Sequence, residues 1–131
     1  MDEILEYLTS VPAWYLATCE GDQPRVRPFS FAAIDGGRLW FCTATNKDVY
    51  HQLKANPKFE LSGWKPGFGW IVVTGKASMI DEVSPETRKA GYDHMTALGE
   101  TYDGPEDPRL TFFSLAEGTE KIADIDGSER L

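Results

Sequence analysis

Glycine turns divide the first third of the chain into strand-like segments that lie very close together in sequence. Gly21-Asp22 and Asp35-Gly36-Gly37 separate segments at 13–19, 24–34 and 38–43, which are rich in aromatic and aliphatic residues. Aspartate and glycine together at such a position are a strong hairpin signal. A connection of two or three residues is too short for a parallel crossover. This spacing therefore predicts a mainly β fold built from antiparallel strands.

Helical and strand-like patterns alternate in the rest of the chain. The predicted helices cover 2–10, 46–55 and 84–99, and the later predicted strands cover 58–63, 70–81, 110–115 and 121–125. We expect the last two strands to form a closing hairpin across Glu117-Gly118, and Trp64 to Gly69 to form a loop. About seven strands and three helices predict an antiparallel barrel with helices at its ends. The length of 131 residues predicts a single domain, residues 1–131.

The charge and the sequence of the N-terminus exclude several classes of protein. A net charge of −8 argues against binding to nucleic acid or to an anionic membrane, because a phosphate surface needs a dense cationic footprint. No apolar run approaches the 18 residues or so that span a bilayer. The acidic start, Met1 to Ile4, lacks the pattern of a signal peptide. Cys19 and Cys42 are expected to be reduced thiols, and the protein is expected to be cytoplasmic.

Two arginines point to one face of a predicted strand. Arg25 and Arg27 alternate with Val26 and Pro28, so their side chains share a face. Adjacent guanidinium groups repel each other unless an anion lies between them, and arginine binds phosphate in a forked geometry. Pairing with the many carboxylates of the chain is an equally good interpretation of these two residues alone.

A second anion-binding pattern follows where the third predicted strand gives way to a helix. If Thr45 or Asn46 caps that helix, free backbone N–H groups and the positive end of the dipole lie at its start. Such an end binds anions readily. Thr43 and Asn46 add hydrogen-bond donors, and Lys47 adds charge. An ordinary helix cap with an exposed lysine is the commoner outcome of such a sequence, so the hypothesis of a phosphate site depends on both patterns together.

The residues offer no candidate for a metal site or for a catalytic acid or base. The two histidines, His51 and His94, have no Cys or Glu at metal-ligand spacing. No hydrolase nucleophile motif is present. Catalytic residues are therefore left unassigned.

Several of these motifs together resemble the pyridoxamine 5′-phosphate oxidase-like family of FMN-binding split-barrel proteins. The resemblance extends from about Tyr7 to Asp126. The segments that carry it are Tyr15-Leu16-Ala17-Thr18, Arg25-Val26-Arg27-Pro28-Phe29, Leu39-Trp40-Phe41-Cys42-Thr43, Asn46-Lys47-Asp48-Val49-Tyr50, Ala55-Asn56-Pro57 and Val73-Thr74-Gly75-Lys76-Ala77.

The resemblance implies an antiparallel split β-barrel that forms a homodimer and binds FMN between its subunits. By position it implies a set of cofactor-binding residues, namely Arg25, Val26, Arg27, Pro28, Phe29, Cys42, Thr43, Asn46, Lys47 and Trp70. The resemblance implies that Arg25, Arg27, Asn46 and Lys47 bind the phosphate. Trp70 departs from the family pattern, which has a polar residue near the flavin at this position, so we expect an indole that stacks or lines the pocket.

The expected function is that of a flavoprotein, with FMN as its cofactor and an oxidoreductase activity on an unknown small substrate. NADPH or NADH is a possible electron donor. The C-terminal residues that grip pyridoxal in true pyridoxamine phosphate oxidases have no counterpart here, so FMN is implied more strongly than vitamin B6 chemistry. The alternatives are a non-catalytic FMN-binding electron carrier, a split barrel that binds deazaflavin or haem, and a protein-interaction module.

Overall fold

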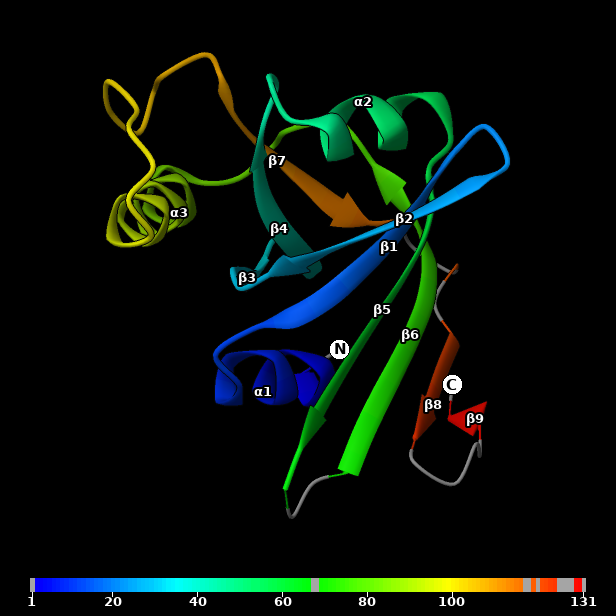
Figure 1. Ribbon diagram of the computed structural model, residues 1–131. Helices are drawn as coiled ribbons and strands as arrows, with labels where there is room; N and C mark the ends of the chain where they lie inside the picture. Colours follow the sequence, from blue (N-terminus) through cyan, green and yellow to red (C-terminus); the bar gives the residue numbers. More distant parts are fainter. Residues whose placement is uncertain (1, 67–68, 117–118, 120, 125–128, 131) are drawn as a thin grey trace.

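The computed structural model of the chain describes residues 2–66, 69–116, 119, 121–124 and 129–130. The helices of this part are α1 (Asp2–Ser10), α2 (Asp48–Ala55) and α3 (Pro85–Ala97). Its strands are β1 (Trp14–Glu20), β2 (Gln23–Phe29), β3 (Ala32–Asp35), β4 (Arg38–Ala44), β5 (Lys58–Lys65), β6 (Gly69–Ser78), β7 (Leu110–Leu115), β8 (Lys121–Asp124) and β9 (Glu129–Arg130). The predicted fold class, mainly β with flanking helices, is confirmed (Figure 1).

The strands form one antiparallel sheet that curves without closing. Its main path runs β2-β1-β5-β6-β7-β4-β3, and β8 and β9 extend it from the side of β6. The two ends of this path, β2 and β3, are consecutive strands of the chain with only Ser30 and Phe31 between them. The ends of the sheet must therefore approach each other. No ladder joins β2 to β3 among the described residues, so the sheet is open at this point.

The break at Ser30 and Phe31 corrects the prediction of one continuous strand over 24–34. The first half, β2, pairs with β1, and the second half, β3, pairs with β4. A single straight strand could not reach both partners, because β1 and β4 are separated by three strands along the sheet path. The chain turns out of the ladder at these two residues, which as a result border the cleft described below.

The predicted closing hairpin is wrong. Strand β7 lies between β4 and β6, where Phe113 faces Phe41 and Leu115 faces Ala77. Strand β8 pairs with β6 and β9 instead of β7. A local turn signal cannot specify a partner strand that lies about 70 residues earlier, and the turn itself, at 117–118, lies outside the described residues. The predicted loop from Trp64 to Gly69 is shorter than expected, because β5 continues through Lys65 and β6 begins at Gly69.

The helix ends follow their local sequence signals in one case and depart from them in another. Ser84 caps α3, accepting a hydrogen bond from the backbone N–H of Thr87 at 3.3 Å, with Pro85 in the first turn as predicted. Helix α2 begins at Asp48, two residues later than predicted. Its N-cap is Lys47, whose side chain caps nothing, so neither Thr45 nor Asn46 has the predicted role.

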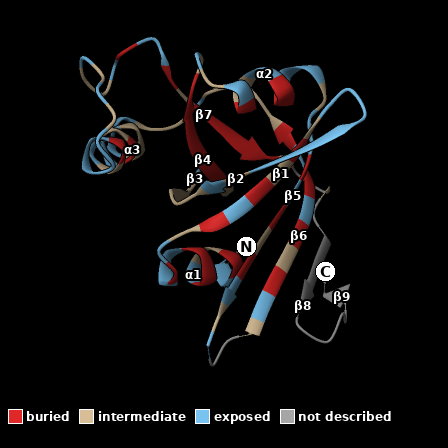
Figure 2. Ribbon diagram, in the orientation of Figure 1, coloured by how far each residue is buried: buried red, intermediate tan, exposed pale blue. Residues whose placement is uncertain are grey.

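The core lies inside the curved sheet and beneath α1 and α2 (Figure 2). Alternation in β1 turns Trp14, Leu16 and Thr18 inward and leaves Tyr15 exposed, which is the period-2 pattern of a half-buried strand. Strands β4 and β7 are buried over most of their length. They separate this core from a second, smaller one beneath α3, formed by Trp40, Cys42, Met95, Leu110 and Phe112.

Gly91 brings α3 close to the sheet. A Cβ at this position would overlap the Phe112 ring and lie 3.2 Å from Cys42 Sγ, so only glycine allows the helix this approach. The close packing places the last turn of α3, with Met95 and Leu98, beside β4 and the Ser30 break. None of the helices in the described part of the chain has both the length and the apolar character that crossing a bilayer requires.

Candidate functional site

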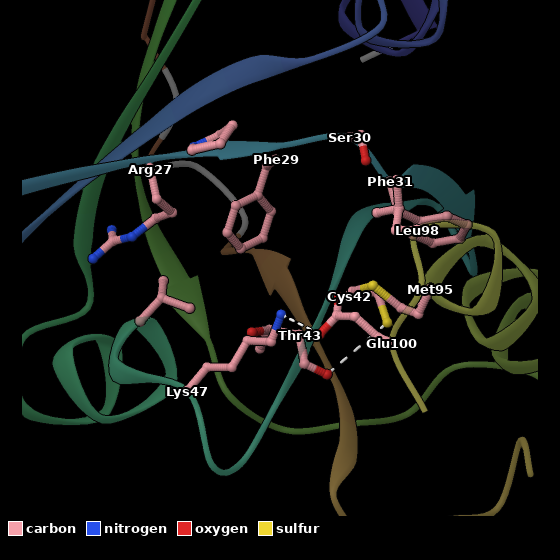
Figure 3. A pocket seen from close by; sticks show the side chains of 12 residues that line it. Arg27, Phe29, Ser30, Phe31, Cys42, Thr43, Lys47, Met95, Leu98 and Glu100 are labelled. Carbon is pink, nitrogen blue, oxygen red and sulfur yellow. Dashed lines mark hydrogen bonds and ion pairs between the residues drawn. The ribbon is translucent and has the colours of Figure 1, made fainter. Parts of the chain in front are cut away.

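A cleft opens where β2, the end of β4 and the first turn of α2 meet the last turn of α3. It consists of two adjoining cavities of about 120 Å³ and about 500 Å³, which share Arg27, Lys47 and Val49. The inner cavity is also lined by Pro28, Phe29, Ser30, Phe31, Cys42, Thr43, Met95, Leu98 and Glu100. The outer cavity is also lined by Glu20, Arg25, Val26, Asp48 and Gln52. Figure 3 shows Arg27, Phe29 and Phe31 along one side of the inner cavity, opposite Lys47, Thr43 and Cys42.

Arg27 is a cation held by neutral partners. Its guanidinium donates to Thr18 Oγ1 at 2.7 Å, to the Leu16 carbonyl at 3.3 Å and to Gln52 Oε1. Partial burial lowers the pKa of Arg27, and the nearby Asp48 carboxylate opposes that effect. Because no carboxylate is within ion-pair distance in the described part of the chain, its positive charge is available to an anion in the cleft.

Arg25 shares the face of Arg27, as the alternation in β2 predicts, and both line the outer cavity. Its guanidinium is already paired with Glu20 across the β1–β2 turn, with Nη2 and Nε at 2.8 Å and 3.1 Å from the same carboxylate oxygen. Both side chains are half exposed. An ion pair this open to water is worth about 0–1 kcal/mol, so Arg25 can exchange its partner at little cost.

Lys47 reaches into the cleft from the start of α2 and is met there by a carboxylate. Its Nζ lies 2.5 Å from Glu100 Oε1 (Figure 3). The Tyr102 hydroxyl donates to the same oxygen at 3.2 Å. Burial, together with the Glu100 charge, raises the pKa of Tyr102 to about 12, so the phenol remains protonated and donates this hydrogen bond. Lys47 is therefore shared between the cleft and this internal partner.

Thr43 presents an unsatisfied hydroxyl to the cleft. It is 1% exposed, it lines the inner cavity, and Oγ1 has no hydrogen-bond partner among the described residues. A buried hydroxyl without a partner costs about 1–3 kcal/mol, so a ligand group that bonded to it would recover part of that cost. The position fits a polar group of a ligand that enters the inner cavity.

The inner end of the cleft is apolar. Phe29, Phe31, Met95 and Leu98 line it, with the thiol of Cys42. Burial raises the pKa of Cys42 to about 12, so this thiol is un-ionised and a poor nucleophile. Apolar walls beside an end that carries three cationic side chains suit a ligand that joins an aromatic ring to an anionic group.

The Ser30 hydroxyl is a polar group on the wall of this apolar end. It lies 2.6 Å from Nε2 of His94, a histidine of α3 whose ring also packs against Phe31. No group of three or more His, Cys, Asp or Glu side chains in the described part of the chain is arranged to hold a metal ion.

The structure brings together eight of the ten residues that the sequence singled out. Arg25, Val26, Arg27, Pro28, Phe29, Cys42, Thr43 and Lys47 all line the cleft. Asn46 instead lines a neighbouring cavity of about 260 Å³ with Tyr102 and Arg109, which Lys47 also borders. Trp70 lies on β6 beside Trp64, is 48% exposed and lines neither cavity of the cleft.

Sequence reasoning missed the carboxylates and the far wall of the cleft. Glu20 and Glu100 pair with two of the three cations, and Met95 and Leu98 come from α3. Glu20 could have been found, because it is placed across a short hairpin from Arg25. Glu100 lies 53 positions after Lys47 in the sequence, and no local pattern joins the two.

The open antiparallel sheet and the cleft between β2 and α2 define the split-barrel class that the sequence resembles. The family model described as pyridoxamine 5′-phosphate oxidase matches residues 1–121 of 131. The chain belongs to this family. No curated protein matches it significantly.

Solved structures share the fold over nearly the whole chain. A NimC/NimA family protein from Clostridium acetobutylicum has 31% identity and a TM-score of 0.80, over 99% of this chain and 89% of that one. The General Stress Protein 26 from Bacillus anthracis has 18% identity and a TM-score of 0.74, over 98% and 95%. A protein named F420 reductase has 24% identity and a TM-score of 0.60, over 88% and 94%. The last two matches are evidence of a common fold alone.

Proposed function

We propose that this protein is a flavoprotein that binds FMN in the cleft and uses it for two-electron redox chemistry on a small organic substrate. The observation that carries the proposal is Arg27, a cation whose hydrogen-bond partners among the described residues are all neutral, in a cleft whose other end is apolar. Membership of the pyridoxamine 5′-phosphate oxidase family supports the choice of a flavin.

The residues present fit the two halves of FMN. Arg27, Lys47 and Arg25 would hold the phosphate, since all three line the outer cavity. The N–H groups in the first turn of α2, which the Lys47 side chain leaves uncapped, would add donors at the positive end of the helix dipole. The Thr43 hydroxyl, which is buried and has no partner in the part of the chain that the structure describes, would bond to a polar group of the cofactor.

The ring system would supply hydride transfer when bound, and the protein would position it and exclude water. Phe29, Phe31, Met95 and Leu98 provide the apolar surface that does so. Cys42 contributes packing rather than chemistry, because its thiol is un-ionised. No side chain is assigned as a catalytic acid or base. NADH or NADPH is the proposed electron donor.

A homodimer belongs to the same proposal. Cross-strand pairing of Tyr15 with Pro28 and of Trp64 with Trp70 places their side chains on the outer face of the β2-β1-β5-β6 part of the sheet. Tyr15, Val26, Trp64 and Trp70 are 54%, 68%, 61% and 48% exposed there. Large exposed aromatics of this kind are typical of interfaces. We propose that a second copy covers this face; Trp64→Arg should then yield monomers in light scattering, and a wild-type monomer would refute the dimer.

The compartment we propose is the cytoplasm, where thiols stay reduced. Cys19 and Cys42 are both free, as expected of proteins in a reducing compartment.

The first test is the colour of the purified protein. An absorption spectrum distinguishes FMN from deazaflavin and haem, and mass spectrometry of the released cofactor identifies it. Mixing the FMN-loaded protein anaerobically with NADH or NADPH should bleach the flavin band. Absence of bleaching with both would favour an electron carrier over an enzyme. Failure of the protein to bind FMN even at about millimolar concentration would refute the proposal. The remaining interpretation would then be a protein-interaction module.

A further inference from the structure

We infer that Glu100 sets the affinity and selectivity of the cleft, because its carboxylate pairs with Lys47, one of the three cations proposed to hold the phosphate. The inference rests on the proposed function and adds a residue to it that opposes the cofactor. A phosphate-bearing flavin would have to displace the Glu100 carboxylate from Lys47 or bind beside it. A flavin without phosphate would not meet this opposition.

The backbone at Glu100 is fixed by the end of α3. Its N–H donates to the Met95 carbonyl at 3.1 Å, and the N–H of Gly99 donates to the Thr96 carbonyl at 3.0 Å. Gly99 has a φ of +86°, and these two bonds form the Schellman motif that ends many helices. The backbone of residue 100 therefore has its position set by helix geometry, so no backbone freedom is lost when its side chain meets Lys47.

The carboxylate at residue 100 contacts two partners through one oxygen. Glu100 Oε1 lies 2.5 Å from Lys47 Nζ and accepts the Tyr102 hydroxyl at 3.2 Å. The Glu100 side chain is 28% exposed and that of Lys47 is 39% exposed, so water screens this pair less than it screens Arg25 and Glu20. Both residues line the inner cavity, which places the carboxylate within the proposed cofactor site.

The number of charged side chains that line the cleft shows why the Glu100 carboxylate should affect phosphate binding. Three cations line the two cavities, and so do three carboxylates, Glu20, Asp48 and Glu100. The lining therefore has no net formal charge, which is an unusual setting for a phosphate dianion. Glu20 pairs on the half-exposed rim, whereas Glu100 pairs inside the cleft. A phosphate on Lys47 thus competes directly with Glu100 and also meets the Asp48 carboxylate in the outer cavity, so we expect FMN to bind reversibly and to exchange with free FMN.

The test compares Glu100→Gln with Glu106→Gln in the full chain. Glutamine keeps the size of the side chain and an oxygen that can accept from Lys47 and Tyr102, so the change removes charge with little loss of shape. Glu106 is an exposed residue of the same loop that lines neither cavity of the cleft, and its substitution makes the same change in net charge. FMN and riboflavin are titrated against each variant by flavin fluorescence at low and at high salt, and thermal unfolding checks that each variant is folded.

We expect Glu100→Gln to tighten FMN binding about tenfold at low salt and to leave riboflavin within about twofold, because a charge at this range is only partly screened. The gain should shrink at about 1 M salt. Glu106→Gln should leave both ligands unchanged. Unchanged or weaker FMN binding to Glu100→Gln would overturn the inference, as would an equal gain for riboflavin or an equal gain in Glu106→Gln.

A separate arm distinguishes this inference from the proposed function. If the wild-type chain binds neither flavin, the same variants are titrated with inorganic phosphate by calorimetry. Tighter phosphate binding to Glu100→Gln alone would support the role of Glu100 while the flavin proposal fails. Equal phosphate binding by wild type, Glu100→Gln and Glu106→Gln would overturn the role of Glu100 as well as the flavin proposal.

Discussion

Replacing Arg27 with methionine should weaken FMN binding far more than the same change at Arg25. Arg27 donates to Thr18, Leu16 and Gln52, all through uncharged oxygens, and its charge is therefore free to interact with a phosphate. Arg25 forms an ion pair with Glu20, and its side chain is half exposed. Methionine keeps most of the length and packing of the arginine stem in both variants.

The magnitudes follow from the two environments. A charge-assisted hydrogen bond is worth about 1.5–3 kcal/mol, so Arg27→Met should raise the Kd for FMN about 10- to 150-fold. An exposed cation contributes about 0–1 kcal/mol, so Arg25→Met should raise it by no more than about fivefold. Riboflavin, which has no phosphate, should bind all three proteins within about twofold of one another.

Folding should survive the Arg27 change. The Thr18 hydroxyl still donates to Gln52 Oε1 at 2.6 Å, so these two groups retain a partner after the guanidinium is gone. The assay is quenching of flavin fluorescence, with urea denaturation as the check on stability. An equal loss for riboflavin would mean that Arg27 acts through the fold. A larger loss for Arg25→Met than for Arg27→Met would refute the assignment of Arg27 as the principal phosphate ligand.

Three further predictions concern the elements that frame the cleft. Gly91→Ala should destabilise the protein by about 1–3 kcal/mol and lower its melting temperature by roughly 4–12 °C, because the added methyl overlaps Phe112. Calorimetry measures the melting temperature, and an unchanged value would contradict the close packing of α3 against Phe112. The Cys42 thiol, whose pKa is raised to about 12 by burial, should resist iodoacetamide at about pH 8 until the protein unfolds, which mass spectrometry of the labelled peptide detects. A hydrogen bond from the Arg109 guanidinium holds the pKa of Asp107 well below its usual range, and two backbone N–H groups contribute smaller effects in the same direction. This stabilisation is present above about pH 4 and is lost as the pH falls toward the folded-state pKa. Asp107→Asn should therefore have a lower free energy of unfolding in urea than wild type at pH 7, and the difference between the two should narrow below about pH 4. A difference that does not depend on pH would contradict this prediction.

The sequence was informative wherever a signal is local. The turn at Asp35-Gly36-Gly37 joins β3 and β4 with φ of +59° and +76° at its glycines, a conformation that glycine adopts without strain. Ser84 caps α3 because its hydroxyl reaches the N–H of Thr87 three residues later. Alternation in β2 placed Arg25 and Arg27 on one face, since the side-chain period of a strand is fixed by the backbone.

The features that were missed depend on contacts between distant parts of the chain. The pairing of β7 with β4 is one, because a strand pattern reveals which face is buried but not which neighbour it joins. Glu100 is another, since its approach to Lys47 depends on how closely Gly91 lets α3 pack. The interruption at Ser30 also arises from the topology, as the two strands it joins belong to opposite ends of the sheet path.

The most direct test of the phosphate site is the difference in affinity between FMN and riboflavin for the wild-type protein. Both ligands carry the same ring and ribityl chain, so equilibrium dialysis of the two under the same conditions isolates the phosphate. We predict that FMN binds at least about tenfold more tightly at low salt, with an advantage that declines as salt is added. Equal affinities for the two ligands would show that the cations of the cleft do not hold a phosphate, and would contradict the proposed site.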